Sequence, residues 1–428
     1  MQDIFKGKKL LLLGGSRNMK EILDAAHAMG IQVGVTDWYD TNVSPVKLMA
    51  DEYFDVSITD YPELQQLIID NNYDGVMTGY TDSYLEPYAE LCDLCKFPCY
   101  GTKEQFSILT NKQKYKKLFE EFGVPTLEPY NAAEINQDFD NYPLMLKPIE
   151  GSGGKGLEIV YDYDEYKEVI KNKDVKYLIE PYIAERNEMT AFFLFIDNEV
   201  YLSGTANRFL SKPQGDKIGL PVFYSFPSSY DAVFRQYTAE PMKEMFKSLG
   251  VKDGMLFAQC MIHEGVVKVY DMGYRLTGSL EYKLQEKMYN FNPLNMMIHH
   301  SMTGKMLPDD TKLDIEKLMR NDIFGFNVTM LGKEGTIERI EGYDKIMQIP
   351  GVIDCAFKMI AGESIKEHMI GTLGQIVARI FFTSDNLNEA MRILQEIYQN
   401  INIIDTQGNN MILDTFNIND LVKFYNIS

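Results

Sequence analysis

Apolar and polar residues follow a helix–strand alternation in the N-terminal part of the chain. Three apolar runs predict strands at residues 9–13, 31–36 and 75–78. Helical patterns lie between them, at residues 17–28 and 62–71. Strands that alternate with helices in this way predict a parallel, doubly wound sheet.

The pattern changes to period two between residues 188 and 271. The predicted strands are residues 189–196, 199–209, 254–263 and 265–275. Their alternation and hairpin turns predict an antiparallel sheet. The last hundred or so residues predict short strands, a helix at residues 387–399 and a hairpin around TQGNN.

A glycine-rich segment separates two apolar runs in LMLKPIEGSGGKGLEIV, residues 144–160. Its backbone N–H groups can point at an anion, and phosphate is the usual one. The spacing is not that of a Walker loop, because Ile149 precedes Lys155 by six residues and Gly156 follows it. The alternating residues after Gly156 predict a strand. We therefore expect a β-hairpin flap over a nucleotide, with a flexible hairpin tip as the alternative.

A second glycine turn, Gly14-Gly15, follows the first predicted strand. It can hold a small anion or a substrate group at the carboxyl end of that strand. It lacks the third glycine of a dinucleotide fingerprint. The alternative is a tight turn between strand and helix.

Composition narrows the class of protein. The chain has 428 residues, 45% of them apolar, and a net charge of −20. We expect no nucleic-acid or anionic-membrane partner through a basic face. No apolar run is long enough to span a membrane, and the N-terminus does not predict a signal peptide, so we expect a cytoplasmic protein.

Five cysteines are present, three of them in CDLCKFPC at residues 92–99. A zinc site needs a fourth ligand, usually from a second Cys/His pair. The adjacent His299 and His300 cannot share one face of a strand or helix. We expect reduced structural cysteines, with zinc as the alternative.

Several motifs in order suggest a family. NKQKYKKLFEEFGVP, residues 111–125, predicts a helix that carries Lys112, and Lys147 ends a strand before the glycine loop. In their order and spacing these motifs resemble the ATP-grasp superfamily. The nearest resemblance is to carboxylate–amine ligases related to biotin carboxylase and to the synthetase domains of the carbamoyl phosphate synthase large subunit.

The resemblance covers nearly the whole chain and implies an α/β and α+β fold. It implies a Rossmann-like pre-ATP-grasp domain at residues 1–105 and an ATP-grasp domain at residues 106–325, whose lid lobe is about 125–185. It further implies a mixed C-terminal subdomain at residues 326–428.

The resemblance implies ATP as a cofactor. Lys112 and Lys147 would neutralise the α- and β-phosphates, and the glycine flap would cover them and exclude water. Glu180 to Ile183 would read adenine through the main chain, and Glu188 would accept ribose hydroxyls, although one residue is inserted before it. The residues expected to bind ATP are Lys112, Lys147, Gly151, Ser152, Gly153, Gly154, Lys155, Gly156, Glu180, Pro181, Tyr182, Ile183 and Glu188.

The resemblance also implies Mg²⁺, which prefers hard oxygen ligands. The superfamily pattern is an acid or Gln on one strand, then Glu-x-Asn on the next. Here the metal candidates are Gln259 and Asp271, and Gly273 stands where the pattern has Asn. The alternatives are weak binding of one ion, a water in place of the missing ligand, or the loss of a second ion.

Arg275 would stabilise charge during phosphoryl transfer, and Arg275 and Lys147 are the catalytic candidates. The residues expected to contact the substrate are Arg208, Lys212, Arg275, Thr277 and Gly278, together with neighbouring Leu276 and Ser279. We expect residues 212–229, which contain three prolines, to form a loop that closes over the substrate, or a surface connection.

These roles imply an ATP-dependent ligase that forms a C–N bond through an acyl-phosphate. Its partners would be a small carboxylate and a small amine. The alternatives are a synthetase of purine precursors and an ATP-binding regulatory protein that has lost its chemistry. A homodimer contact by the C-terminal subdomain is a further expectation.

Overall fold

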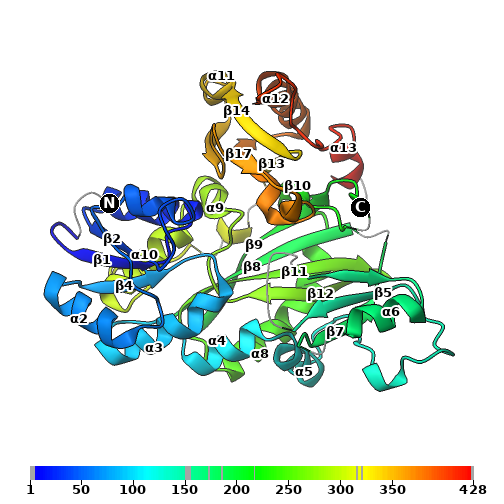
Figure 1. The fold of residues 1–428 in the computed structure, drawn as a ribbon, viewed down its shortest axis with the longest axis horizontal. Coiled ribbons are helices and arrows are strands. Elements are labelled where there is room, and N and C mark those ends of the chain that lie inside the picture. The colour runs from blue at the N-terminus through cyan, green and yellow to red at the C-terminus, as the bar shows by residue number, and fades with distance from the viewer. Residues whose placement is uncertain are drawn as a thin grey trace.

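The computed structural model describes residues 5–149, 156–171, 174–184, 187–215, 217–314, 317–319 and 322–425 (Figure 1). The N-terminal part lies at one side of the molecule, the long strands cross its middle, and the C-terminal part lies above them.

The N-terminal part contains the parallel sheet that the sequence predicts. Its strands, in the order β3-β2-β1-β4, are β3 (Glu52–Phe54), β2 (Gln32–Thr36), β1 (Lys9–Leu13) and β4 (Gly75–Thr78). The helices of this part are α1 (Lys20–Ala28), α2 (Tyr61–Asn71) and α3 (Leu85–Cys95). Strands β1, β2 and β4 are almost entirely buried, as expected for a parallel sheet with helices on its faces.

A small lid of three antiparallel strands carries the two ends of the glycine loop. Its strands, in the order β6-β5-β7, are β6 (Glu158–Val160), β5 (Leu144–Pro148) and β7 (Tyr177–Pro181). Helix α6 (Tyr163–Ile170) packs against them with a hydrophobic cluster of its own. The pairing of β5 with β6 confirms the predicted hairpin, whose tip at residues 150–155 lies outside the described residues.

One antiparallel sheet runs through the centre and into the C-terminal part. Its eight strands have the order β12-β11-β8-β9-β10-β13-β17-β15. Their bounds are β8 (Asn187–Ile196), β9 (Glu199–Leu210), β10 (Pro221–Phe226), β11 (Gly254–His263), β12 (Val266–Gly273), β13 (Phe324–Leu331), β15 (Val352–Phe357) and β17 (Ile376–Ser384). The sheet therefore continues across residue 325.

Strand β10 corrects the expectation of a loop over residues 212–229. Pro221 and Pro227 suggested a connection, but Pro221 is the first residue of the strand and Pro227 follows its end. Proline is tolerated at these places because it withholds only one donor at the edge of the ladder. Between them, VFYSF is fully buried and pairs with β9 and β13.

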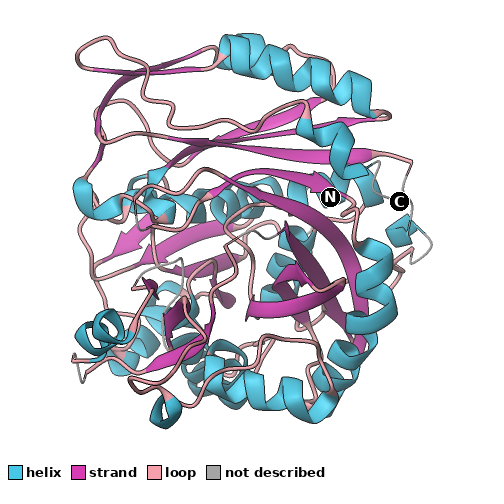
Figure 2. Cartoon of the chain, turned by 90° about the vertical axis from the view of Figure 1, so that its right-hand side faces the viewer, coloured by secondary structure: helices cyan, strands magenta, loops and turns pink. Residues whose placement is uncertain are grey.

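The remaining elements enclose the central sheet. A fourth sheet, with the strand order β16-β14-β18, contains β14 (Gly335–Glu341), β16 (Ser364–Ile365) and β18 (Asn402–Asp405). The helices are α4 (Lys103–Thr110), α5 (Lys112–Phe122), α7 (Asp231–Phe234), α8 (Glu240–Ser248), α9 (Tyr282–Tyr289), α10 (Pro293–Thr303), α11 (Tyr343–Met347), α12 (Leu387–Asn400) and α13 (Asp420–Tyr425). Helix α12 confirms the predicted C-terminal helix and lies over the C-terminal strands at the top of the molecule (Figure 2).

Candidate functional site

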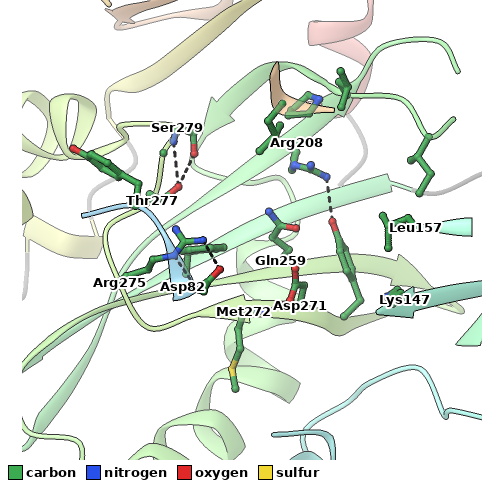
Figure 3. A pocket seen from close by; sticks show the side chains of 18 of the residues that line it. Asp82, Lys147, Leu157, Arg208, Gln259, Asp271, Met272, Arg275, Thr277 and Ser279 are labelled. Carbon is green, nitrogen blue, oxygen red and sulfur yellow. Dashed lines mark hydrogen bonds and ion pairs between the residues drawn. The ribbon is translucent and has the colours of Figure 1, made fainter. Parts of the chain in front are cut away.

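A cavity of about 390 Å³ lies where the N-terminal part, the lid, the central sheet and the C-terminal part meet. It brings together eight of the site residues that the sequence singled out, from distant parts of the chain (Figure 3). The predicted site residues that line it are Lys112, Lys147, Arg208, Gln259, Asp271, Arg275, Thr277 and Gly278. Two lysines from separate segments therefore face Asp271 and Arg275 across one space.

Lys112 reaches the cavity because helix α5 begins beside it. The side chain of Asn111 accepts hydrogen bonds from the backbone N–H groups of Gln113 and Lys114, both at 3.1 Å, and so caps the helix. Gly123, with φ of +67°, ends it. Lys112 is thereby fixed as the first helical residue, with 7% of its surface exposed.

The side chain of Lys147 is held in place by an ion pair with Glu180. The carboxylate of Glu180 has no exposed surface and lies 2.5 Å from the ammonium of Lys147 and 2.5 Å from that of Lys116. Burial raises the pKa of Glu180, but the two lysines outweigh it and lower the pKa overall. Glu180 is therefore an ionised anchor for Lys147, and its side chain does not line the cavity.

Lys116 was missed by sequence reasoning. The buried face of α5 consists of Lys112, Tyr115, Lys116 and Phe119, which follow helical spacing. That spacing places Lys116 on the inner face with Lys112 and could have identified it. Its ammonium also donates to the carbonyl oxygen of Leu127 at 3.1 Å, in the connection between α5 and the lid strand β5.

Gln259 and Asp271 form the floor of the cavity. They lie directly opposite each other on β11 and β12 (Figure 3). The buried hydroxyl of Tyr115 donates to Oδ1 of Asp271 at 3.1 Å, and burial followed by the charge of Asp271 holds the pKa of Tyr115 well above its usual value. Among the described residues, no group of three or more His, Cys, Asp or Glu side chains forms a metal cluster. The amide oxygen and the carboxylate are nevertheless the hard donors that Mg²⁺ accepts, so this pair fits the ion.

Arg275 is fixed by a carboxylate from the N-terminal part. Its Nε and Nη2 donate to Oδ1 and Oδ2 of Asp82 at 2.6 Å and 2.9 Å. The guanidinium also lies 5.1 Å from the ring centroid of Phe257. Burial lowers the pKa of Arg275, but Asp82 more than offsets this. Sequence reasoning missed Asp82, because a single acid in a loop after β4 carries no signal of its partner.

The far end of the cavity is cationic and belongs largely to the C-terminal part. Lys358 and Arg379 line it beside Thr277, Gly278 and Ser279. Burial, followed by the charge of the nearby Arg379, lowers the pKa of Lys358 to about 7. Neither cation was singled out in the sequence, because both lie in strands or connections with no motif. Together with the Thr277–Ser279 segment they line this end of the cavity, and the charge of the buried Glu281 acts on both of them.

A second cavity of about 370 Å³ adjoins the first, since Arg208 lines both. It contains Tyr182, Glu188 and Lys212, so Lys212 does not face Asp271 and Arg275. Glu188 is buried; its Oε2 accepts hydrogen bonds from Arg208 and, at 3.0 Å, from the hydroxyl of Tyr270.

The remaining nucleotide candidates lie at the border of this region. Pro181 ends β7, and Pro181 and Ile183 are not among the described residues that line either cavity. Gly156 adopts φ of +71°, and its neighbour Leu157 lines the first cavity. The phosphate candidates Gly151, Ser152, Gly153, Gly154 and Lys155 lie outside the described residues.

The Gly14-Gly15 turn is closed by its own chain. Asp37, directly after β2, accepts hydrogen bonds from the N–H of Gly15 at 3.1 Å and the hydroxyl of Ser44 at 3.0 Å. A Cβ atom on Gly15 would lie 2.0 Å from that hydroxyl oxygen. The segment after β2 thus packs directly against Gly15, as expected for a tight turn between strand and helix.

The cysteines are free thiols, as expected for structural cysteines. Cys92 and Cys95 lie on α3, near its end. Within the described part of the chain, no helix has the length and apolar character that crossing a membrane requires.

No family model matches the chain. Among curated proteins, it is similar to the formate-dependent phosphoribosylglycinamide formyltransferases of Sulfurisphaera tokodaii (29% identity over 222 residues) and Sulfolobus acidocaldarius (25% over 202 residues). These matches cover 47% and 44% of this chain and 54% and 50% of the relatives. The chain thus spans about half the length of the curated relatives it matches.

Solved structures match over most of the chain. The L-amino acid ligase of Bacillus licheniformis has a TM-score of 0.75 at 17% identity, covering 94% of this chain and 99% of that one. The phosphoribosylglycinamide synthetase of Anaerococcus prevotii has a TM-score of 0.70 at 19% identity, covering 93% and 100%. The biotin carboxylase domain of the Hydrogenobacter thermophilus 2-oxoglutarate carboxylase, solved with MgADP and bicarbonate, has a TM-score of 0.71 at 18% identity, covering 92% and 90%.

Proposed function

We propose that this chain, which has the ATP-grasp fold, is an ATP-dependent ligase that joins a carboxylate to an amine through an acyl-phosphate. The observation that carries the proposal is the shared cavity of Lys112, Lys147, Asp271 and Arg275. The relatives support it, because ligases and synthetases recur among them.

The triphosphate would lie between the lid and the central sheet. Lys112 and Lys147 would neutralise phosphate oxygens as point charges on long stems. Glu180 holds Lys147 in place before the nucleotide arrives, which lowers the cost of ordering that side chain on binding. The adjoining cavity with Tyr182 and Glu188 would receive the nucleoside.

Gln259 and Asp271 would hold Mg²⁺, which when bound supplies charge neutralisation to the β- and γ-phosphates. Tyr115 fixes the orientation of Asp271 through its hydrogen bond.

The substrate carboxylate would lie at the cationic end, beside Thr277, Gly278 and Ser279. One carboxylate oxygen attacks the γ-phosphorus, the bond from phosphorus to the β-bridging oxygen breaks, and ADP leaves. Arg275 stabilises the charge on the transferred phosphoryl group. The amine then attacks the acyl carbon, the bond from that carbon to the phosphate oxygen breaks as the C–N bond forms, and one amine proton leaves with the inorganic phosphate.

A single-turnover experiment tests this reaction. The protein is incubated with ATP, Mg²⁺ and a panel of small carboxylates, and hydroxylamine is added to trap an acyl-phosphate as a hydroxamate. We expect a hydroxamate that requires both ATP and one member of the panel. Hydrolysis of ATP without hydroxamate across the panel would contradict the proposal.

A synthetase of purine precursors is the second candidate, favoured by the similarity to two formyltransferases that act on phosphoribosylglycinamide. In the same assay, formate with a ribosylated amine would then be the productive pair. An ATP-binding regulatory protein would instead bind Mg–ATP without turnover. We further propose a cytoplasmic location and a homodimer. Size-exclusion chromatography with light scattering would test the homodimer.

A further inference from the structure

Gly273 leaves one position of the metal-binding pattern without a side chain. A Cβ atom on Gly273 would lie 2.7 Å from Cε1 and Cζ of Phe257, so the phenyl ring fills the space beside β12. The next atom that this Cβ would meet is Oδ1 of Asp82, at 3.6 Å. A carboxylate from the N-terminal part therefore lies within reach of the position that a side chain at residue 273 would occupy.

We propose that Asp82 supplies the oxygen ligand that Gly273 lacks. The Mg²⁺ that accompanies ATP would then be held by Gln259 and Asp271 from the central sheet and by Asp82 from the N-terminal part. This inference rests on the proposed function, because it concerns the metal that the nucleotide brings.

The chemistry of Asp82 allows this role alongside its contact with Arg275. Each carboxylate oxygen carries two lone pairs, so an oxygen that accepts a hydrogen bond from the guanidinium can also coordinate a cation. Carboxylate oxygens are hard donors of the kind that Mg²⁺ prefers. Asp82 lines the same cavity as Gln259 and Asp271, and its side chain keeps 22% of its surface exposed.

The local structure holds Asp82 in this position. It is the first residue of a short 3₁₀ segment, Asp82–Tyr84, that follows β4. The ring of Tyr84 packs so closely on Gly14 that a Cβ there would lie 2.5 Å from Tyr84 Cε2. The glycine turn after β1 thus lets the segment approach, and the segment points Asp82 at the cavity. The N-terminal part would in this way contribute directly to nucleotide binding.

The experiment measures how much Mg²⁺ tightens the binding of a non-hydrolysable ATP analogue. Calorimetry gives the dissociation constant with Mg²⁺ and with a chelator, and their ratio reports the metal's contribution. In Asp82→Asn we expect this ratio to fall by about tenfold or more, with the affinity in chelator unchanged. Asp271→Asn is the positive control and is expected to lower the same ratio.

Two further variants separate a ligand from a merely structural residue. Arg275→Ala removes the partner of Asp82 and is expected to preserve the ratio. Glu363→Gln removes the ion pair with Arg17, another link between distant parts of the chain, and should also leave it unchanged. Thermal unfolding checks that each variant is folded.

An unchanged ratio in folded Asp82→Asn would overturn the inference and leave Asp82 as a positioning residue for Arg275. A ratio that falls in Arg275→Ala as far as in Asp82→Asn would overturn it too, because the guanidinium would then carry the effect. Absence of Mg²⁺-dependent binding in the unchanged protein would overturn the proposed function itself.

Discussion

The cations at the two ends of the first cavity differ in their partners. At the end near the lid, Lys147 is paired with Glu180, and across the cavity, beside Thr277, Arg275 is paired with Asp82. At the end near the C-terminal part, Lys358 forms no ion pair with any described residue, and Arg379 donates to the neutral Asn327 and Thr329. The charge of the buried carboxylate of Glu281 acts on both of these cations without an ion-pair contact.

The difference indicates what each end is built to receive. Paired cations are held in place before a ligand arrives, which suits a ligand of fixed shape such as a triphosphate. Buried cations that are not in ion-pair contact with a carboxylate carry a desolvation cost that an anionic ligand can offset. Under the proposed function, the lid end would therefore receive the nucleotide and the other end an anionic substrate group.

Glu180→Gln, at the lid end, is expected to have the largest effect and to lower the folding stability of the protein. It leaves Lys116 and Lys147 without their shared carboxylate, and removing one partner of a buried ion pair costs about 3–5 kcal/mol of folding stability. Denaturant unfolding at neutral pH would measure this. Because the folded pKa of Glu180 is lowered, its stabilisation is present above the ordinary value of 4.5 and is lost as the pH falls through the folded pKa. A variant with unchanged stability at neutral pH would show that the pair is dispensable.

Lys112→Met tests whether the paired end serves the nucleotide. Removing one charge that faces the phosphates should weaken ATP binding by about 2–5 kcal/mol, with little effect on folding. Lys114→Met is the matched control, because Lys114 is an exposed lysine on the same helix. Calorimetric titration with ATP measures both, and equal effects in the two variants would contradict the assignment.

Lys358→Met tests the end of the cavity near the C-terminal part. We expect the variant to be more stable than the unchanged protein but to bind an anionic substrate less tightly. The folded pKa of about 7 lies below the ordinary 10.5, so between these pH values the unfolded chain binds more protons and stability rises with pH. In Lys358→Met this rise should be absent. At pH 6 the variant should be about 1–4 kcal/mol more stable.

The same variant should lose affinity for an anionic substrate, measured in the trapping assay as a raised concentration requirement. Lys358→Arg keeps the charge and should retain binding at high pH better than the unchanged protein. Equal pH dependence of unfolding in Lys358→Met and the unchanged protein would contradict the burial cost.

Gly273→Ala tests how closely the ring of Phe257 packs on Gly273 beside the floor of the cavity. The added Cβ would meet Phe257 at 2.7 Å, and such overpacking costs about 1–3 kcal/mol. Adding Phe257→Ala should reduce that cost in a double-mutant cycle measured by denaturant unfolding. Additive effects of the two substitutions would show that the ring and the glycine do not share this space.

Lys212→Ala should have the smallest effect. Lys212 lines the second cavity rather than the phosphate end, so we expect a change in ATP binding of less than 1 kcal/mol. A larger change in calorimetry would place this lysine on the phosphates.

The sequence predicted what depends on local pattern. The resemblance to the ATP-grasp motifs singled out Gln259 and Asp271, and the pattern of residues 111–125 predicted the helix that carries Lys112. Helical spacing also places Lys116 on the same face of its helix as Lys112, although Lys116 was not singled out. Strand β10 was missed because its flanking prolines outweighed the β-branched and aromatic residues between them.

The rest of the site depends on how distant parts pack. Asp82 lies 193 residues before Arg275, and no spacing rule links them. Lys358 and Arg379 become functional candidates only because the C-terminal strands extend the central sheet over the cavity. A charge far along the chain gives no local signal of the cavity it will face.

That unbroken sheet also limits how the molecule can open. Strands β10 and β13 are joined by a continuous ladder from Phe223 to Phe226, so a hinge between the central and C-terminal parts would have to break main-chain hydrogen bonds. The lid has its own hydrophobic cluster and its own sheet, separate from that ladder. A movement of the lid would leave the pairs between β10 and β13 intact, so we expect the lid, rather than the C-terminal part, to move when ligands enter and leave.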